Sequence, residues 1–127
     1  MNYLIDTHVI IWHLHEYHKL SNEANKILDD PKMSKFISQA SLIELSIKMS
    51  LGKIKLQCDW NDLFYYFNKA GWTILPFRNV DFITLSSLNL HHGDPFDRLM
   101  ACQAINQKMK LISKDIIFDS YGVTRIW

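Results

Sequence analysis

The chain has 127 residues, of which 48% are hydrophobic and 21% are charged. This length suits one domain with one core, and the composition is that of a globular protein, which excludes a disordered or fibrous chain. Lys and Arg total 14 and Asp and Glu total 13, a formal net charge of +1, so the overall charge does not indicate a nucleic-acid binder.

Short apolar segments alternate with helical patterns along the chain. The predicted elements are, in order, a strand at 2–5, a helix at 7–15, a helix from Ser21 to a stop at Pro31, a weak strand at 35–38, a helix at 41–51, a helix at 60–70, a strand at 73–75, a helix at 79–88, a helix from Asp94-Pro95 to about Gln107, and strands at 111–113 and 123–126. This alternation predicts a single α/β domain over residues 1–127. We expect a central, mainly parallel β-sheet of four to five short strands flanked by helices. In the helix at 79–88, we expect Val80, Ile83 and Leu88 to face the core.

The first apolar segment is interrupted by Asp6, His8 and His13. These polar residues argue against both a signal peptide and a membrane helix. The two cysteines are too few for a disulfide framework or a cysteine-based zinc site. We therefore expect a soluble, cytoplasmic protein that does not bind membranes.

Four acidic residues are placed to meet at one edge of the predicted sheet. Asp6 directly follows the first strand, Asp115 follows the strand at 111–113, and Glu44 and Asp97 lie in the first turns of two helices. In open parallel sheets, ligands bind beyond the carboxyl ends of the strands. These carboxylates are therefore candidates for one shared site.

Structural roles are also open for each of these acids. Asp6 and Asp115 are suitable N-caps for the segments that follow them. Ser41 and Glu44 match the S-x-x-E capping box, and Glu44 stands four residues before Lys48, which is the spacing of a helical ion pair. Caps alone would account for these positions.

The segment around Asp97 favours a site over a cap. Asp94 before Pro95 is typical of an N-cap followed by proline, and this places Asp97 where the helix dipole favours an acid. However, Asp97 has apolar neighbours, and a lone buried carboxylate is unfavourable. Two carboxylates about 4 Å apart repel by about 4 kcal/mol at an effective dielectric of about 20. A cluster of four therefore calls for a cation, and all-oxygen ligands favour Mg²⁺ or Mn²⁺ over zinc.

Four separated segments carry a family resemblance. They are YLIDTH at 3–8, SLIELSIK at 41–48, HGDPFDRLMACQA at 92–104 and LISKDIIFDSYGV at 111–123. In this order and at this spacing they resemble the PIN-domain ribonucleases, in particular the VapC-type toxins of bacterial toxin–antitoxin pairs.

The resemblance implies a metal-dependent endoribonuclease that hydrolyses RNA phosphodiesters with one or two Mg²⁺ or Mn²⁺ ions. The four acids of the family match Asp6, Glu44, Asp97 and Asp115, which become the expected catalytic and metal-binding residues. The expected supporting residues are Asp94, Ser113 and Thr7, and the Ser113 hydroxyl is placed to touch a ligating carboxylate.

The expected partners also follow from the resemblance. They are an RNA substrate, a small antitoxin encoded nearby and a second copy of the chain, with no direct DNA binding by this chain itself. Arg98, Lys48 and His92 are candidate RNA contacts. For Arg98, a plain surface ion pair is the competing interpretation.

Other charged and aromatic residues allow two interpretations. Four lysines form either a patch around Glu44 that binds the RNA backbone or a solvated face; they are Lys35, Lys48, Lys53 and Lys55. The aromatic residues Trp12, Tyr65, Tyr66 and Phe67 are expected in the core or in a dimer contact rather than as platforms for RNA bases.

Two other functions are weaker alternatives. One is a PIN-fold RNA-binding or assembly protein without catalysis, which the loss of an acid would indicate; all four acids are present. The other is an aspartate-based phosphoryl-transfer domain built on Asp6, but His8 stands where a second acid is needed. A zinc site is disfavoured because the spacing of the six histidines fits no zinc motif.

Overall fold

The computed structural model describes all 127 residues. The central strand of its sheet is β1 (Asn2–Ile5). Tyr3 and Ile5 pack on one face of the sheet and Leu4 packs on the other. Successive side chains of a strand point to opposite faces, so β1 is apolar from Tyr3 to Ile5 because both of its faces are covered there.

The sheet has five strands in the order β3-β2-β1-β4-β5, and every neighbouring pair is parallel. Its other strands are β2 (Ser34–Ser38), β3 (Trp72–Leu75), β4 (Lys110–Ile112) and β5 (Arg125–Ile126). Ile5 is paired with Ile37 on β2 and with Ile112 on β4. The predicted sheet is confirmed, with strand ends that differ by one or two residues.

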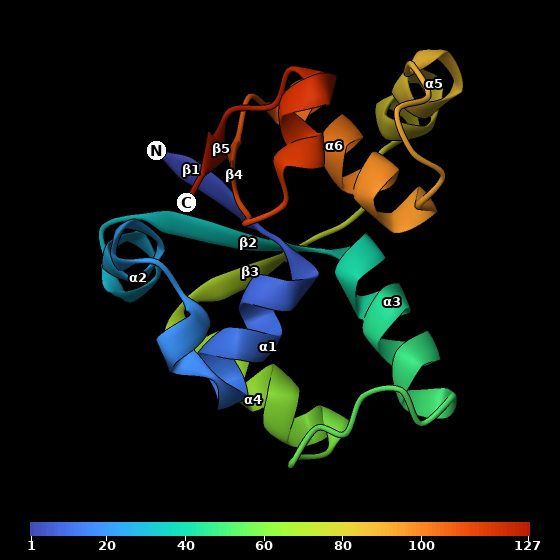
Figure 1. The fold of residues 1–127 in the computed structure, drawn as a ribbon. Coiled ribbons are helices and arrows are strands. Elements are labelled where there is room, and N and C mark those ends of the chain that lie inside the picture. The colour runs from blue at the N-terminus through green and yellow to red at the C-terminus, as the bar shows by residue number, and fades with distance from the viewer.

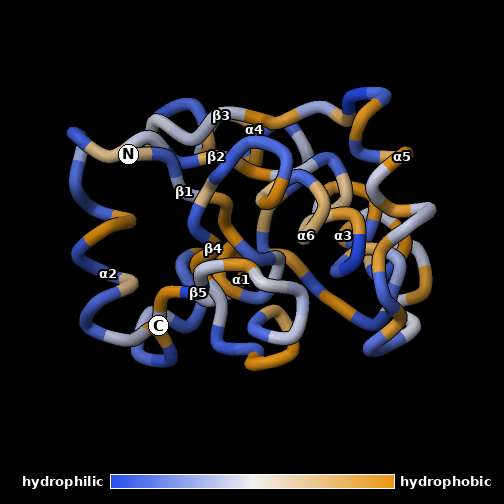
Figure 2. The backbone as a smooth tube through the Cα atoms, turned by 90° about the horizontal axis from the view of Figure 1, so that it is seen from above, coloured by the Kyte–Doolittle hydropathy of each residue, from blue (hydrophilic) through white to orange (hydrophobic).

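Helices cover both faces of the sheet (Figure 1). The six α-helices are α1 (Thr7–His15), α2 (Asn22–Asp29), α3 (Gln39–Ser50), α4 (Trp60–Ala70), α5 (Asn79–Ser87) and α6 (Pro95–Gln107); two short 3₁₀ helices are η1 (Tyr17–Lys19) and η2 (Ile116–Tyr121). Residues of α1, α2 and α4 form one core cluster with the sheet, and residues of α6 and η2 form the other. In Figure 2, the mostly hydrophilic α2 lies at the periphery. None of these helices is both long and apolar enough to cross a membrane.

The α3 helix begins two residues earlier than its sequence pattern predicts. Its N-cap is Ser38, the last residue of β2, whose hydroxyl accepts the backbone N–H of Ala40 at 3.0 Å. The predicted capping box of Ser41 and Glu44 is therefore wrong. Ser41 lies inside the helix instead, where its hydroxyl accepts a hydrogen bond from the Thr7 hydroxyl at 2.8 Å.

The α5 helix presents a different face to the protein than expected. Val80 and Ile83 are 39% and 67% exposed, whereas Asp81 is fully buried. The Asp81 carboxylate accepts hydrogen bonds from the backbone N–H of Arg78 at 2.8 Å and from the side-chain amide of Asn106 on α6 at 2.9 Å. The prediction is wrong for Val80 and Ile83, because a polar contact with α6 orients this helix. It is confirmed for Leu88, which packs against the second core cluster.

A buried amide joins α6 to two strands at their carboxyl ends. Gln103 is fully buried. Its Oε1 accepts a hydrogen bond from the Ser38 hydroxyl, and its Nε2 donates to the carbonyl oxygens of Leu75 and Pro76 at 3.2 and 3.3 Å. This one side chain therefore fixes α6 against the ends of β2 and β3.

Replacing Gln103 by an apolar residue of similar size tests this role. Gln103→Leu is expected to lower the free energy of unfolding by about 2–3 kcal/mol, because it leaves the buried partners of the amide without hydrogen bonds. Urea unfolding measures the change. Gln107→Leu, one turn later on α6, is the control and is expected to change stability by less than about 1 kcal/mol. Equal effects of the two variants would contradict the proposed role.

Candidate metal-binding site

The candidate site lies where the order of the strands reverses. From β1 the chain proceeds to β2 and β3 on one side of the sheet, and it returns to β4 on the other side of β1. Such a reversal leaves a crevice beyond the carboxyl ends of the two central strands. Asp6 directly follows β1, and Ser113 directly follows β4.

Asp6 is held in this crevice by Ser113. The carboxyl is almost fully buried, with the residue 4% exposed, and its Oδ2 accepts a hydrogen bond from the Ser113 hydroxyl at 2.7 Å. Although Asp6 occupies the N-cap position of α1, its side chain makes no capping hydrogen bond. The Ser113 oxygen also accepts the backbone N–H of Asp115 at 3.0 Å. The predicted contact between Ser113 and an acid is therefore present.

Glu44 approaches the crevice from α3. It is 6% exposed, and its Oε2 accepts a hydrogen bond from the Lys48 ammonium at 2.8 Å, one helical turn later. The predicted ion pair between Glu44 and Lys48 is confirmed. The hydrogen bond between Thr7 and Ser41 joins the first turns of α1 and α3, and so fixes the helix that carries Glu44.

Asp97 approaches from the first turn of α6. Asp94 is the N-cap of this helix, as predicted, and its carboxylate accepts the backbone N–H groups of Phe96 and Asp97 at 2.9 and 3.3 Å. The Asp97 Oδ2 lies 3.2 Å from Nε2 of His92, and Nδ1 of the same ring lies 2.8 Å from the Tyr121 hydroxyl. A neutral His92 that donates to Asp97 would accept from Tyr121, so this chain of contacts fixes the ring.

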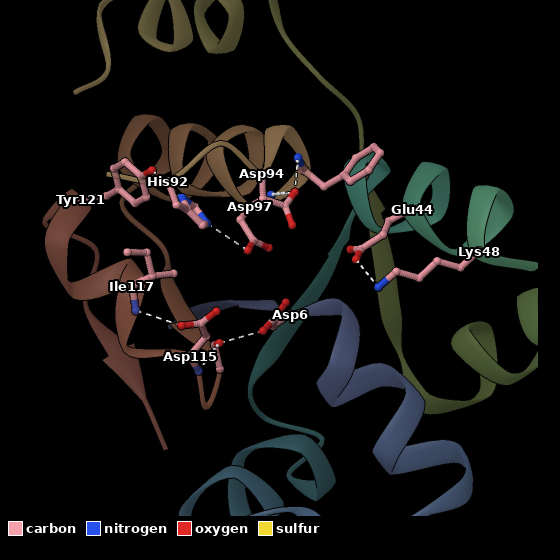
Figure 3. A network of polar contacts seen from close by, with 11 residues as sticks. Asp6, Glu44, Lys48, His92, Asp94, Asp97, Asp115, Ile117 and Tyr121 are labelled. Carbon is pink, nitrogen blue, oxygen red and sulfur yellow. Dashed lines mark hydrogen bonds and ion pairs between the residues drawn. The ribbon is translucent and has the colours of Figure 1, made fainter. Parts of the chain in front are cut away.

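Figure 3 shows the carboxylates of Asp6, Asp97 and Asp115 directed toward a common space, with Glu44 turned toward it from α3. The Asp115 carboxylate also accepts the backbone N–H of Ile117 at 3.0 Å, so this acid caps η2 while it lines the space. No group of three or more His, Cys, Asp or Glu side chains is already arranged to hold a metal ion.

The electrostatics of the crevice favour a bound cation. The pKa of Asp6 is raised from its ordinary value of 3.8 to about 6. Burial is the largest cause, the hydrogen bond from Ser113 opposes the rise, and the charges of Glu44 and Asp115 add to it. Of these four acids only Glu44 forms an ion pair with a lysine or arginine. An oxygen-rich site with excess negative charge suits a divalent cation such as Mg²⁺ or Mn²⁺.

The pKa of Asp97 is raised in the same way. Its pKa is raised from 3.8 to about 6, mainly by burial, while the hydrogen bond from His92 lowers it and the charges of Asp6, Asp94 and Glu44 contribute to the rise. Because Asp6 and Glu44 influence Asp97 although they come from other elements, the acids behave as one electrostatic cluster.

The predicted lysine patch around Glu44 is only partly present. Lys35 lies near the amino end of β2 and is 3% exposed. Its ammonium donates to the carbonyl oxygens of Leu28 and Asp30 at 3.0 and 2.7 Å, so it stabilises the carboxyl end of α2. Lys35 cannot join a patch around Glu44, because Lys35 lies near the amino end of β2 and Glu44 lies beyond its carboxyl end.

The other candidate RNA contacts have defined partners. The Arg98 guanidinium donates to the carbonyl oxygens of Leu88 and Asn89 at 3.3 and 3.2 Å and forms no ion pair with an acid, so the competing prediction of a surface ion pair is wrong. Lys48 and His92 contact Glu44 and Asp97. A role of these three residues in RNA binding stays a prediction.

The structure adds three residues that the sequence patterns did not identify. A cavity of about 250 Å³ beside the acids is lined by Asp6, His8, Trp12, Lys114 and Asp115. In the sequence, His8 and Trp12 stand four residues apart in the helix that follows Asp6, and Lys114 precedes Asp115. This spacing was the available signal, because residues four apart share one face of a helix.

Neutralising a buried acid tests the electrostatics of the cluster. The folded pKa of Asp6 lies above its unfolded value, so the native state binds the proton more tightly and the stability of the metal-free protein falls as the pH rises from about 4 through about 6. Asp6→Asn removes this effect and is expected to raise the free energy of unfolding at neutral pH by up to about 3 kcal/mol. The difference should vanish below about pH 4.

Urea unfolding with a chelator present, over this pH range, measures the difference. Glu23→Gln on the exposed side of α2 is the matched control, and no pH-dependent difference is expected for it. An Asp6→Asn variant that is no more stable than the wild type at neutral pH would contradict the pKa shift.

Known proteins share this fold at low sequence identity. A chain of the crystal structure of VapBC2 from Rickettsia felis bound to a DNA fragment from their promoter is similar with a TM-score of 0.74 and 19% identity, over 99% of this chain and 98% of that chain. A chain of FitAcB from Neisseria gonorrhoeae has a TM-score of 0.63 and 17% identity, over 98% of this chain and 96% of that chain.

No curated protein matches the chain in sequence. The family model described as the PIN domain matches residues 3–123. This match begins within β1 and ends before β5, so it covers four of the five strands, and it includes Asp6, Glu44, Asp97 and Asp115. The chain therefore belongs to the PIN domain family.

Proposed function

We propose that the chain is a Mg²⁺- or Mn²⁺-dependent endoribonuclease and the toxin of a bacterial toxin–antitoxin pair. The observation that carries this proposal is the convergence of four acids, from the ends of β1 and β4 and from α3 and α6, on one crevice. The family match supports a nuclease. The working unit in this proposal is the single domain of residues 1–127.

Asp6, Glu44, Asp97 and Asp115 would hold the metal. When bound there, a divalent ion would supply an activated water molecule for in-line attack on a phosphodiester and would offset charge on the phosphate oxygens. The raised pKa values of Asp6 and Asp97 support this assignment, because a bound cation would offset both causes of the rise, burial first and the neighbouring charges second.

The residues around the acids orient them. Ser113 fixes one oxygen of Asp6, Lys48 fixes one oxygen of Glu44, and His92 fixes one oxygen of Asp97. Each contact leaves the other oxygen of that carboxylate available to a ligand. Residues that hold metal ligands in this way usually contribute 10- to 100-fold to metal affinity or activity.

The similar structures support a protein partner. VapBC2 is a complex bound to promoter DNA, and its chain covers almost the whole length of this one. We propose a small antitoxin encoded nearby, which would bind operator DNA while this chain does not, and we propose that the chain forms a homodimer. The substrate in this proposal is RNA, and the working compartment is the cytoplasm.

Cleavage of a mixed RNA substrate tests the nuclease assignment. The wild type is expected to cut in Mg²⁺ or Mn²⁺ and to stop when the metal is chelated. Asp97→Asn is expected to lower the rate by about 100-fold or more, because a metal ligand supports several kcal/mol of transition-state stabilisation. Ser113→Ala is expected to lower it by about 10- to 100-fold.

Glu23→Gln is the control for this series, since it removes an exposed acid on α2, a helix that carries none of the four acids. Equal cutting by the wild type and Asp97→Asn would contradict the site assignment. Binding of RNA without cleavage by the wild type would favour the non-catalytic PIN-fold alternative.

Growth of bacteria that express the chain tests the proposed pairing. Expression alone is expected to arrest growth, and Asp97→Asn is expected to relieve the arrest in parallel with the loss of cleavage. Co-expression of the neighbouring small gene is expected to restore growth, with both proteins purifying together. Arrest that persists with Asp97→Asn would contradict toxicity through RNA cleavage.

A further inference from the structure

The cavity beside the acids is continuous with the candidate metal site. Its volume is about 250 Å³, and its lining combines two of the four acids, Asp6 and Asp115, with His8, Trp12 and Lys114. We refer to it as the Trp12 cavity. It is smaller than the clefts of about 300–1,000 Å³ that hold drug-sized ligands, so it suits a single planar ring rather than an extended molecule.

Trp12 forms an aromatic wall of this cavity. Its ring packs against the ring of Trp127 with centroids 5.8 Å apart and against the ring of His8 with centroids 5.9 Å apart. Trp12 is half-buried, with part of it packed on the core cluster and part lining the cavity. The expectation that Trp12 serves only in the core or in a dimer contact is therefore incomplete, because this ring also lines the cavity, with the Lys19 ammonium 6.0 Å from its centroid.

Lys114 supplies a cation at the same place. Its side chain is exposed, and it forms neither an ion pair nor a side-chain hydrogen bond within the protein. It lines the Trp12 cavity together with Asp6 and Asp115, so its charge lies beside the acid cluster. A free ammonium beside a group of carboxylates favours a ligand with an anionic part, such as a phosphodiester.

We propose that the Trp12 cavity is a nucleobase subsite, in which a base that flanks the scissile phosphate stacks on Trp12 while Lys114 contacts the backbone. This inference rests on the proposed ribonuclease function. An aromatic wall with a cation at its edge is the combination that binds single-stranded nucleic acid, because every base has a face that stacks. Stacking of this kind contributes affinity and positioning and tolerates any base.

The indole signals in an NMR spectrum test stacking without any cleavage. The four tryptophans give four indole N–H signals, and Trp12→Phe identifies the one from Trp12. A nucleoside 5′-monophosphate is expected to shift this signal, whereas ribose 5-phosphate, which lacks the base, is expected to leave it unchanged. Equal shifts with both probes, or no shift with the monophosphate, would overturn the proposal.

Cleavage of short single-stranded RNA gives the second measurement. Trp12→Ala is expected to lower kcat/KM about 5- to 150-fold, mainly through KM, and Trp12→Phe is expected to lower it much less. A substrate without the stacked base should lose a similar factor with the wild type and almost nothing further with Trp12→Ala. Tyr65→Ala, which removes an exposed aromatic ring on α4, is the matched control.

The two measurements separate this proposal from the proposed function. A wild type that stacks the monophosphate but cuts no RNA would contradict the ribonuclease and leave the subsite in place. A wild type that cuts RNA, with the same penalty for the missing base in Trp12→Ala as in the wild type, would overturn the subsite alone. The penalty is the ratio of kcat/KM for the full substrate to kcat/KM for the substrate without the stacked base, measured with the same variant. A smaller folded fraction of Trp12→Ala lowers both values equally and so leaves the ratio unchanged.

Discussion

The hydrogen bond from Ser113 to Asp6 joins the ends of the two central strands, and the candidate site depends on it. Both residues follow strands whose side chains are buried on two faces, so neither can shift without moving the core. The same hydroxyl accepts the backbone N–H of Asp115. One serine therefore sets the position of two of the four acids, and α3 and α6 bring the other two toward them.

The acid cluster opposes folding while the core favours it. Asp6 and Asp97 are held where burial and neighbouring charges disfavour their ionised forms. The apolar residues on both faces of β1 offset this repulsion, since burial of apolar surface is the dominant favourable contribution to folding. Functional sites often retain such locally unfavourable groups because a ligand relieves them.

The sequence predicted the features that depend on local pattern and on the order of the strands. It did not predict the burial of side chains whose partners are distant in the sequence. The positions of the four acids at strand and helix ends followed from the alternation of strands and helices. The burial of Asp81 depends on Asn106, and the buried ammonium of Lys35 depends on carbonyl groups at the end of α2. The open ring of Trp12 depends on which side of α1 lies beside Asp115. The spacing of His8 and Trp12 indicates one shared face of α1, but no pattern within one helix or strand says which distant residues lie beside that face.

The pairing of β1 with β4 has a consequence for the order of assembly. Tyr3 and Ile5 pair with Lys110 and Ile112, more than a hundred residues later in the chain, and contacts of this separation form late because closing so long a loop loses much chain entropy. During synthesis, β1 can pair with β2 long before β4 leaves the ribosome. Asp6 then lacks both Ser113 and Asp115, and the crevice has only one wall. A nascent chain thus carries an incomplete site until residues 110–115 have emerged, which separates its synthesis in time from its chemistry.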